Sequence, residues 1–270
     1  MVQYASQAAE HDDSGCCSGS PKARVLIAIP VYNEEKHIGS VIPRVLERSP
    51  DVLVIDDGST DLTPQMLARF PVEVVRHAKN RGYGRSMQDA FRWARVDGFD
   101  WVITMDCDEQ HEPDAIPAFM DAIARNDADV ISGSRYLAQG PLDDQPPADR
   151  RAINAAITDE INRTLDLSLT DGFCGFKAYR VDAVSRLALD EDGYAFPLQF
   201  WAQAARRGLR IREIPVRLIY NDLNRTFGGP LNDPQVRINH YRDVFHAELA
   251  RVGIAPHAPA SEAPSGCACH

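Results

Sequence analysis

Residues 101–111 read WVITMDCDEQH, an apolar run that leads directly into a cluster of acidic side chains. The run is short and bounded by polar residues, which is typical of a buried strand. Asp106 and Asp108 follow where this strand ends, so both carboxylates leave the sheet at a turn and can reach one ion. Mg²⁺ prefers a few carboxylate oxygens together with phosphates and water. The stretch therefore predicts a metal site at the end of a strand, with Gln110 as a third, neutral ligand.

Other short apolar runs lead into polar clusters in the same way. Strands are expected at 25–29, 52–55, 72–75 and from 129 to 132, and helices at 34–48, from Thr63, at 84–95 and at 113–125. This alternation predicts an open, mostly parallel α/β sheet flanked by helices. The polar clusters are PVYNEE (30–35), DDGST (56–60), HAKNRGYG (77–84), DCDEQH (106–111) and GSRY (133–136). Ligands bind at the carboxyl ends of parallel strands, so we expect these clusters to converge on one crevice.

The second half of the chain is less regular. The stretch 137–151 is rich in loop-forming residues, and a helix over 152–166 follows it with its apolar side chains on one stripe. The remaining predicted elements are a strand at 175–180, a helix at 197–207, a strand at 210–220 and a last helix at 234–250. Because the linkers are short, we predict a single domain over residues 23–251.

Two tails are expected to be disordered, residues 1–22 and 252–270. They carry the pairs Cys16 with Cys17 and Cys267 with Cys269, which we expect to be free thiols. A soft-metal site formed by the two tails is the alternative, although their spacing matches no standard zinc site.

The overall charge excludes one class of partner. The 270-residue chain has a net charge of −10 and a pI near 5.2, so a nucleic-acid partner is not expected. The sequence shows no secretory signal and no apolar run of the ~18 residues that a membrane span needs. We therefore expect a cytoplasmic protein without a transmembrane segment, in peripheral contact with the membrane at most. The helix over 152–166 is expected to pack on the body of the protein rather than enter a bilayer.

Two clusters besides the acidic one can contact a nucleotide. Asp56 or Asp57 can accept from the N3–H of uracil or from the N1–H edge of guanine, or the pair can serve only as a turn and helix cap. The run NRGYG (80–84) opens a predicted helix and can offer backbone N–H groups to an anion, with charge from Lys79 or Arg81. It matches neither the P-loop nor the dinucleotide-binding fingerprint.

Taken together, these motifs resemble family 2 glycosyltransferases of the GT-A fold, which is a Rossmann-like α/β fold. The clusters over residues 25–136 carry this resemblance by their order and spacing. Within the family, Gln110-His111 and GFCGFKA (172–178) resemble the branch of dolichyl-phosphate mannose synthases and polyprenyl-phosphate glycosyltransferases. The resemblance implies a nucleotide-sugar half at 23–136 and an acceptor half at 137–251.

The resemblance also implies roles for individual residues. The nucleotide-sugar pocket would be lined by Pro30, Tyr32, Glu34, Asp56, Asp57, Arg81 and Gly82. Asp106, Asp108 and Gln110 would hold Mg²⁺ or Mn²⁺, with the two aspartates at the centre of catalysis. Arg135, together with Arg150 or Arg151, would clamp phosphates, and Arg225 would do likewise.

The activity implied is that of an inverting hexosyltransferase using a UDP- or GDP-sugar. Its leading acceptor is a polyprenyl phosphate, which arrives ionised and needs no general base. A soluble hydroxyl or phosphorylated acceptor is the alternative, and a hydroxyl would need a base, for which Asp192 is the candidate. A protein that binds nucleotide sugars without catalysis is a third, less favoured interpretation.

Overall fold

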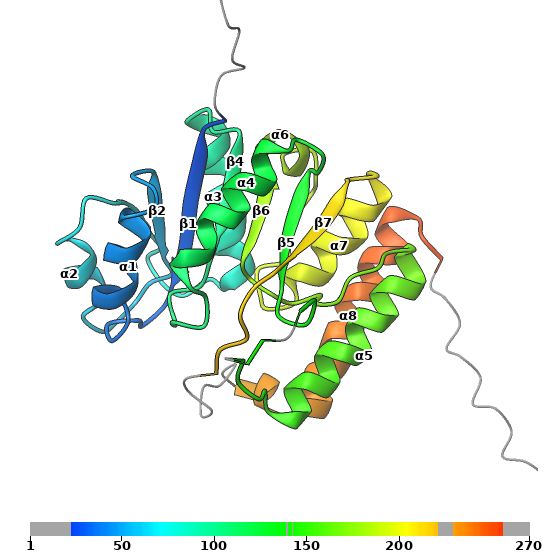
Figure 1. Ribbon diagram of the computed structural model, residues 1–270. Helices are drawn as coiled ribbons and strands as arrows, with labels where there is room; N and C mark the ends of the chain where they lie inside the picture. The colour runs from blue at the N-terminus through cyan, green and yellow to red at the C-terminus, as the bar shows by residue number, and fades with distance from the viewer. Residues whose placement is uncertain (1–22, 139, 142, 221–228, 256–270) are drawn as a thin grey trace, which may run out of the picture.

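The computed structural model describes residues 23–138, 140–141, 143–220 and 229–255, and its centre is one seven-stranded sheet (Figure 1). The strand order is β3-β2-β1-β4-β6-β5-β7. The strands are β1 (Val25–Val31), β2 (Val52–Asp56), β3 (Glu73–Arg76), β4 (Trp101–Thr104), β5 (Val130–Ser134), β6 (Lys177–Arg180) and β7 (Ile211–Pro215).

All neighbouring strands are parallel except at β6, which runs antiparallel to both β4 and β5. Ile103 of β4 pairs with Ala178 of β6, and Ala178 in turn pairs with Ile131 of β5. The prediction of an open, mostly parallel sheet in a single α/β domain is confirmed. The sequence did not indicate that a strand from the second half would be inserted between β4 and β5.

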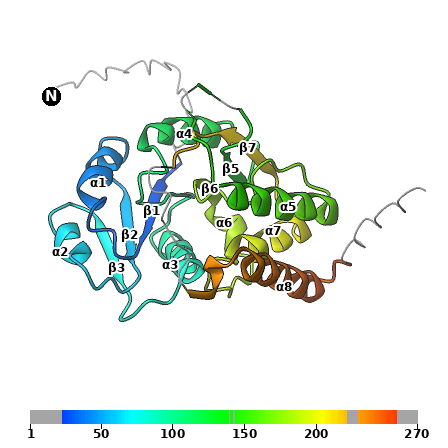
Figure 2. The same cartoon turned by 90° about the horizontal axis from the view of Figure 1, so that it is seen from below.

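Helices cover both faces of the sheet and bury one apolar core on each (Figure 2). One face carries α1 (Ile38–Leu46), α2 (Thr63–Leu67), the 3-10 turn η1 (Pro113–Ala115) and α4 (Ile116–Ala124). The other carries α3 (Tyr83–Val96), α5 (Ala148–Leu165), α6 (Val181–Val184), α7 (Phe196–Arg206) and α8 (Pro234–Val252), which is preceded by η2 (Gly229–Asn232). Side chains alternate along each strand, so Leu26 and Ile27 enter opposite cores.

Helix α5 packs as the sequence predicted. Ile153, Ile157, Ile161 and Leu165 are all buried in the core that α5 shares with α7 and α8. Burying four such side chains supplies apolar contacts that hold α5 against α7 and α8. Within the described ranges, no helix is both long enough and apolar enough to cross a membrane.

Helix α1 and strand β7 differ from their predicted bounds. The first helix begins at Ile38 rather than at Glu34, because the backbone N–H groups of Glu34 and Glu35 donate to Thr63 and Asp61 in the next loop. Strand β7 ends at Pro215 rather than at 220. Val216 still donates to Ser134 of β5, and from Leu218 the chain pairs with the loop at 143–144.

The predicted tails lie almost wholly outside the described residues, as do Cys16, Cys17, Cys267, Cys269 and Arg225. Helix α8 continues to Val252, one residue past the predicted end of the domain, and Ile254 still packs against the core. Cys107 and Cys174 are buried free thiols.

Candidate active site

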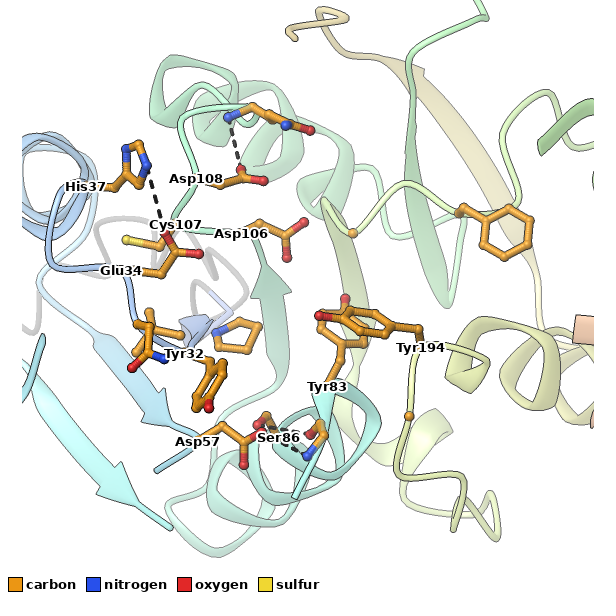
Figure 3. A pocket seen from close by; sticks show the side chains of 18 of the residues that line it. Tyr32, Glu34, His37, Asp57, Tyr83, Ser86, Asp106, Cys107, Asp108 and Tyr194 are labelled. Carbon is orange, nitrogen blue, oxygen red and sulfur yellow. Dashed lines mark hydrogen bonds and ion pairs between the residues drawn. The ribbon is translucent and has the colours of Figure 1, made fainter. Parts of the chain in front are cut away.

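The carboxyl ends of the first five strands open into one cleft of about 980 Å³ (Figure 3). Each of the five polar clusters contributes residues to its lining, which confirms the predicted convergence. Further lining residues come from the second half of the chain: from α5, from the loop that precedes α7, and from α8. Figure 3 shows Glu34, Asp106 and Asp108 facing the space from one side, with Tyr83 and Tyr194 on another.

The loop after β1 places Pro30, Tyr32 and Glu34 in the cleft wall. The turn is held by Asn33, which takes a left-handed φ of 56° and accepts a hydrogen bond from the N–H of Thr60 at 2.8 Å through its side chain. The ring of Tyr32 remains 45% exposed, so it offers an aromatic face to a ligand. These three predicted residues are therefore brought together at one place.

The aspartates of the DDGST cluster have different surroundings. Asp56 is fully buried and lies outside the cleft lining, where it accepts from the N–H of Ser59 at 2.8 Å and pairs with Arg76 at 3.0 Å. Asp57 lies in the lining, and its two oxygens accept from the N–H groups of Arg81 and Gly82, both at 2.8 Å. The turn-forming role therefore belongs to Asp56, and only Asp57 borders the ligand space.

At the start of α3, some of the N–H groups that the sequence suggested for an anion already have partners within the protein. The N–H groups of Arg81 and Gly82 are taken by Asp57, and the N–H of Arg85 donates to the carbonyl of Asp192 at 3.2 Å. Gly82 has a φ of 103°, and a Cβ there would lie 2.2 Å from that same carbonyl oxygen. Gly82 lines the cleft but Arg81 is not part of the lining.

The loop after β4 presents Asp106, Asp108 and Gln110 to the cleft. The side chain of Asp106 is one-third exposed, whereas Asp108 is buried and accepts from the N–H of Gln110 at 3.0 Å. Gly175 lies against Asp106, since a Cβ at position 175 would be 2.8 Å from its Oδ2. The absence of a side chain at Gly175 thus leaves space for the Asp106 carboxylate in the cleft.

His111, which the sequence placed in the family signature, lies buried behind the acidic loop. Its Nδ1 accepts from the N–H of Asp106 at 2.9 Å, and its ring packs on Phe176. The ring that accepts this bond is the tautomer with its proton on Nε2, which lies 3.9 Å from Sγ of Cys174. The histidine therefore supports the loop from below and is not part of the cleft lining.

Arg135 is held in the cleft wall by a buried carboxylate. Its Nε and Nη2 donate to the two oxygens of Asp171 at 2.7 and 3.0 Å, and Asn154 donates to the same aspartate at 2.9 Å. Burial alone would raise the pKa of Asp171, but the neighbouring guanidinium holds it well below its usual range. A bidentate pair of this kind fixes the direction of the arginine.

The two arginines at the start of α5 point to different places. Arg150 lines the cleft, whereas Arg151 lies outside the lining and stacks on the ring of Tyr136, 3.8 Å from its centroid. The structure adds Arg237 of α8 to the lining, where it is 3% exposed and pairs with Asp149 at 2.9 Å. Nothing local in the sequence distinguishes Arg237 from a surface arginine.

Aromatic side chains that the sequence did not single out complete the cleft. Tyr83 and Tyr194 stack with ring centroids 6.2 Å apart, and Phe173 packs against Tyr241 at 5.1 Å. All four line the cleft. The candidate base Asp192 is exposed, lies outside the lining, and its side chain accepts from Gln88 at 3.4 Å.

The sequence matches a known family model, Glycosyl transferase family 2, over residues 26–188. A curated relative, the undecaprenyl-phosphate mannosyltransferase of Micrococcus luteus, is 32% identical over 81% of this chain and 93% of its own. The chain belongs to glycosyl transferase family 2.

A second curated relative and a solved structure are also similar to this chain. The polyprenol monophosphomannose synthase of Mycolicibacterium smegmatis is 29% identical over 75% of this chain and 80% of its own. Glucosyl-3-phosphoglycerate synthase from Mycobacterium tuberculosis, solved with UDP, has a TM-score of 0.65 at 18% identity and covers 88% of this chain and 82% of that one. At this identity the solved structure shows a shared GT-A fold and no more.

The acidic loop of this family 2 glycosyltransferase fits a hard divalent cation. Its donor set consists of two carboxylates and one amide oxygen, the chemistry that Mg²⁺ and Mn²⁺ favour. Among the described residues, no group of three His, Cys, Asp or Glu side chains is placed to hold a metal ion alone. A site with so few protein ligands suits a cation whose remaining ligands are phosphates and water.

Proposed function

We propose that the protein is an inverting hexosyltransferase that moves a sugar from a nucleoside diphosphate donor to a polyprenyl phosphate. Pro30, Tyr32, Glu34, Asp57 and Gly82 would border the nucleoside. Asp106, Asp108 and Gln110 would hold Mg²⁺ or Mn²⁺ at the diphosphate. The names of two relatives support the acceptor and make mannose the first sugar to test, from GDP or UDP.

The distribution of charge along the cleft carries this proposal. Among the described lining residues, every carboxylate comes from the first half: Glu34, Glu35, Asp57, Asp61, Asp106 and Asp108. Arg135, at the end of the first half, and Arg150 and Arg237 of the second half form what we call the basic wall, and the second half adds aromatic side chains. An acceptor bound at the basic wall therefore finds cations and no base, which suits a phosphate that is already ionised.

The proposed reaction is one displacement. An oxygen of the acceptor phosphate attacks C1 of the sugar, and the bond from C1 to the diphosphate breaks with its electron pair leaving on the diphosphate oxygen. No proton is transferred, and the configuration at C1 inverts. A bound divalent cation would neutralise charge on the leaving diphosphate. Arg135, directed by Asp171, would orient a phosphate by charged hydrogen bonds.

Residues 23–136 would bind the nucleotide sugar and residues 137–251 the acceptor, with Arg135 at the boundary between the two halves. A polyprenyl chain resides in the bilayer, so the enzyme would meet its acceptor by peripheral contact, which we place at the cytoplasmic face.

A transfer assay with defined acceptors tests the proposed function. GDP-mannose, UDP-glucose and other donors are incubated with short-chain polyprenyl phosphate or with soluble sugars and sugar phosphates, with Mn²⁺, Mg²⁺ or EDTA. We expect metal-dependent transfer to the polyprenyl phosphate, with the anomeric configuration of the product inverted. Turnover with soluble acceptors alone would reject the proposal.

A substitution distinguishes the hydroxyl alternative. Asp192→Asn is expected to keep the transfer rate within about twofold, because Asp192 lies outside the cleft lining and a phosphate acceptor needs no base. Loss of transfer with intact donor binding would instead favour a hydroxyl acceptor deprotonated by Asp192.

A further inference from the structure

A buried histidine outside the predicted site connects two carboxylates. The Nδ1 of His77 lies 2.6 Å from Oδ1 of Asp57, and its Nε2 lies 3.0 Å from Oδ2 of Asp89. The His77 and Asp57 side chains are each 6% exposed, and that of Asp89 is 17% exposed. Each ring nitrogen therefore lies within hydrogen-bond distance of a carboxylate, and His77 links the two side chains.

Arginine side chains also bind the second carboxylate. Asp89 accepts from Arg85 at 2.8 Å and from Arg92 at 2.8 Å, both on α3. Burial raises the pKa of Asp89, but the hydrogen bonds and charges of these arginines and the hydrogen bond with His77 outweigh it and lower the pKa. His77 thus lies between two carboxylates, each of which has further hydrogen-bond partners.

Asp57 connects His77 to the loop that lines the cleft. Its Oδ1 accepts from both His77 and Arg81, and its Oδ2 accepts from Gly82. The loop fixed in this way is the one that carries Asn80 and Gly82 into the lining. Gly82 has a conformation that only glycine adopts readily and has a carbonyl of another loop against it. Rotation of the Asp57 carboxylate would therefore release this part of the wall.

We propose that His77 is a positioning residue for the nucleotide donor, acting through Asp57 on the loop of Arg81 and Gly82. The inference rests on the proposed function, because it takes the ligand of this wall to be the nucleoside diphosphate. His77 does not touch the reacting atoms. Its loss weakens donor binding and leaves the rate at saturating donor unchanged.

Substitution by two amides separates positioning from packing. His77→Asn keeps an N–H donor near the place of Nδ1, facing Asp57, whereas His77→Gln keeps one near the place of Nε2, facing Asp89. Each variant retains one hydrogen-bond donor and lacks the other. Both remove the imidazole ring, so a loss of stability that they share does not affect the comparison between them. His246→Asn and His246→Gln serve as controls, since His246 pairs with Glu160 at the surface, away from the cleft.

The dissociation constants of GDP and UDP, each with Mn²⁺, are measured by calorimetry for the wild type and the variants. We expect His77→Asn to bind the preferred nucleotide within about threefold of the wild type. His77→Gln is expected to bind it about tenfold more weakly, because this variant loses the hydrogen bond to the Asp57 carboxylate. The turnover at saturating donor is expected to be the same in both, and the His246 variants to be unaffected.

Two results would reject the inference in distinguishable ways. Equal nucleotide affinity in His77→Asn and His77→Gln, with normal binding by the wild type, would show that His77 does not position the loop and would leave the proposed function standing. A wild type that binds neither nucleotide would reject the proposed function and this inference together.

Discussion

Gly175 and Asp106 are in direct contact, and the absence of a side chain at Gly175 makes room for the Asp106 carboxylate. A Cβ at position 175 would lie 2.8 Å from Oδ2 and 3.2 Å from Oδ1 of Asp106. The peptide is held in place because Thr104 of β4 donates to the carbonyl of Gly175 at 2.7 Å. A residue of the second half thus sets the position of a carboxylate of the first.

We predict that Gly175→Ala lowers kcat/KM by about 10- to 100-fold, because the methyl group displaces the Asp106 carboxylate by a fraction of an ångström or more. Steady-state kinetics with the transfer assay measures this. Gly39→Ala is the matched control, since a Cβ at Gly39 meets only the end of Met66 at 3.5 Å. Unchanged kinetics in Gly175→Ala would show that Asp106 does not need its present position.

Asp108→Asn is predicted to remove the metal dependence of nucleotide binding. The amide keeps the size of the side chain but loses the charge that attracts a divalent cation, so Mn²⁺-dependent affinity for the nucleotide falls about tenfold or more. Calorimetry with Mn²⁺ and with EDTA measures both components. The metal-free affinity is expected to stay constant, and Asp159→Asn, at the surface of α5, to behave as the wild type. An Asp108→Asn protein with a full Mn²⁺ effect would disprove this role.

Arg150 and Arg151 are predicted to differ although they are adjacent. Arg150→Ala should raise the KM for polyprenyl phosphate about tenfold, because a charged contact at the basic wall is lost. Arg151→Ala should change it by about threefold or less, because Arg151 lies outside the lining and only stacks on the ring of Tyr136. Acceptor titrations at saturating donor give both values. The reverse order of effects would assign the contact to Arg151.

Asp129 gives a prediction about pH and stability. Hydrogen bonds from Arg210, opposed by burial and reinforced by Arg180, lower the pKa of Asp129 to about 2. A lowered pKa stabilises the fold above the unfolded value of 3.8, and this contribution is lost as pH falls towards 2.

Asp129→Asn should therefore lower the free energy of unfolding by about 1 to 2 kcal/mol at neutral pH and by progressively less from about pH 4 to pH 2. Urea unfolding at a series of pH values measures the difference. Asp182→Asn, whose carboxylate is 73% exposed, is the control and is expected to have little effect. A difference that does not shrink on acidification would contradict the assignment.

The sequence predicted the first half of the fold and the place of the site because both depend on local pattern. Each strand there is an apolar run, and each polar cluster adjoins the strand that positions it, so Pro30, Asp57 and Asp106 meet at one sheet edge. The insertion of β6 between β4 and β5 depends on pairing with residues 45 to 79 positions away, and no local pattern specifies it.

The direction of individual side chains was the other feature that the sequence did not predict. Arg150 and Arg151 are neighbours in one helix, about 100° apart around its axis, so the sequence predicted a basic contact without deciding which residue makes it. The capture of the Arg81 and Gly82 N–H groups by Asp57 and the place of Arg237 both depend on contacts between distant segments. The first joins two loops of the first half, and the second joins α8 to the start of α5.

In the proposed reaction, the attacking atom is an ionised oxygen of the acceptor phosphate, which binds at the basic wall. The most direct measurement compares polyprenyl phosphate with the free polyprenol of the same chain length, using one donor, Mn²⁺ and the wild-type protein. We expect a glycosylated polyprenyl phosphate and no detectable transfer to polyprenol. Transfer to polyprenol at an equal or higher rate would contradict the proposed reaction.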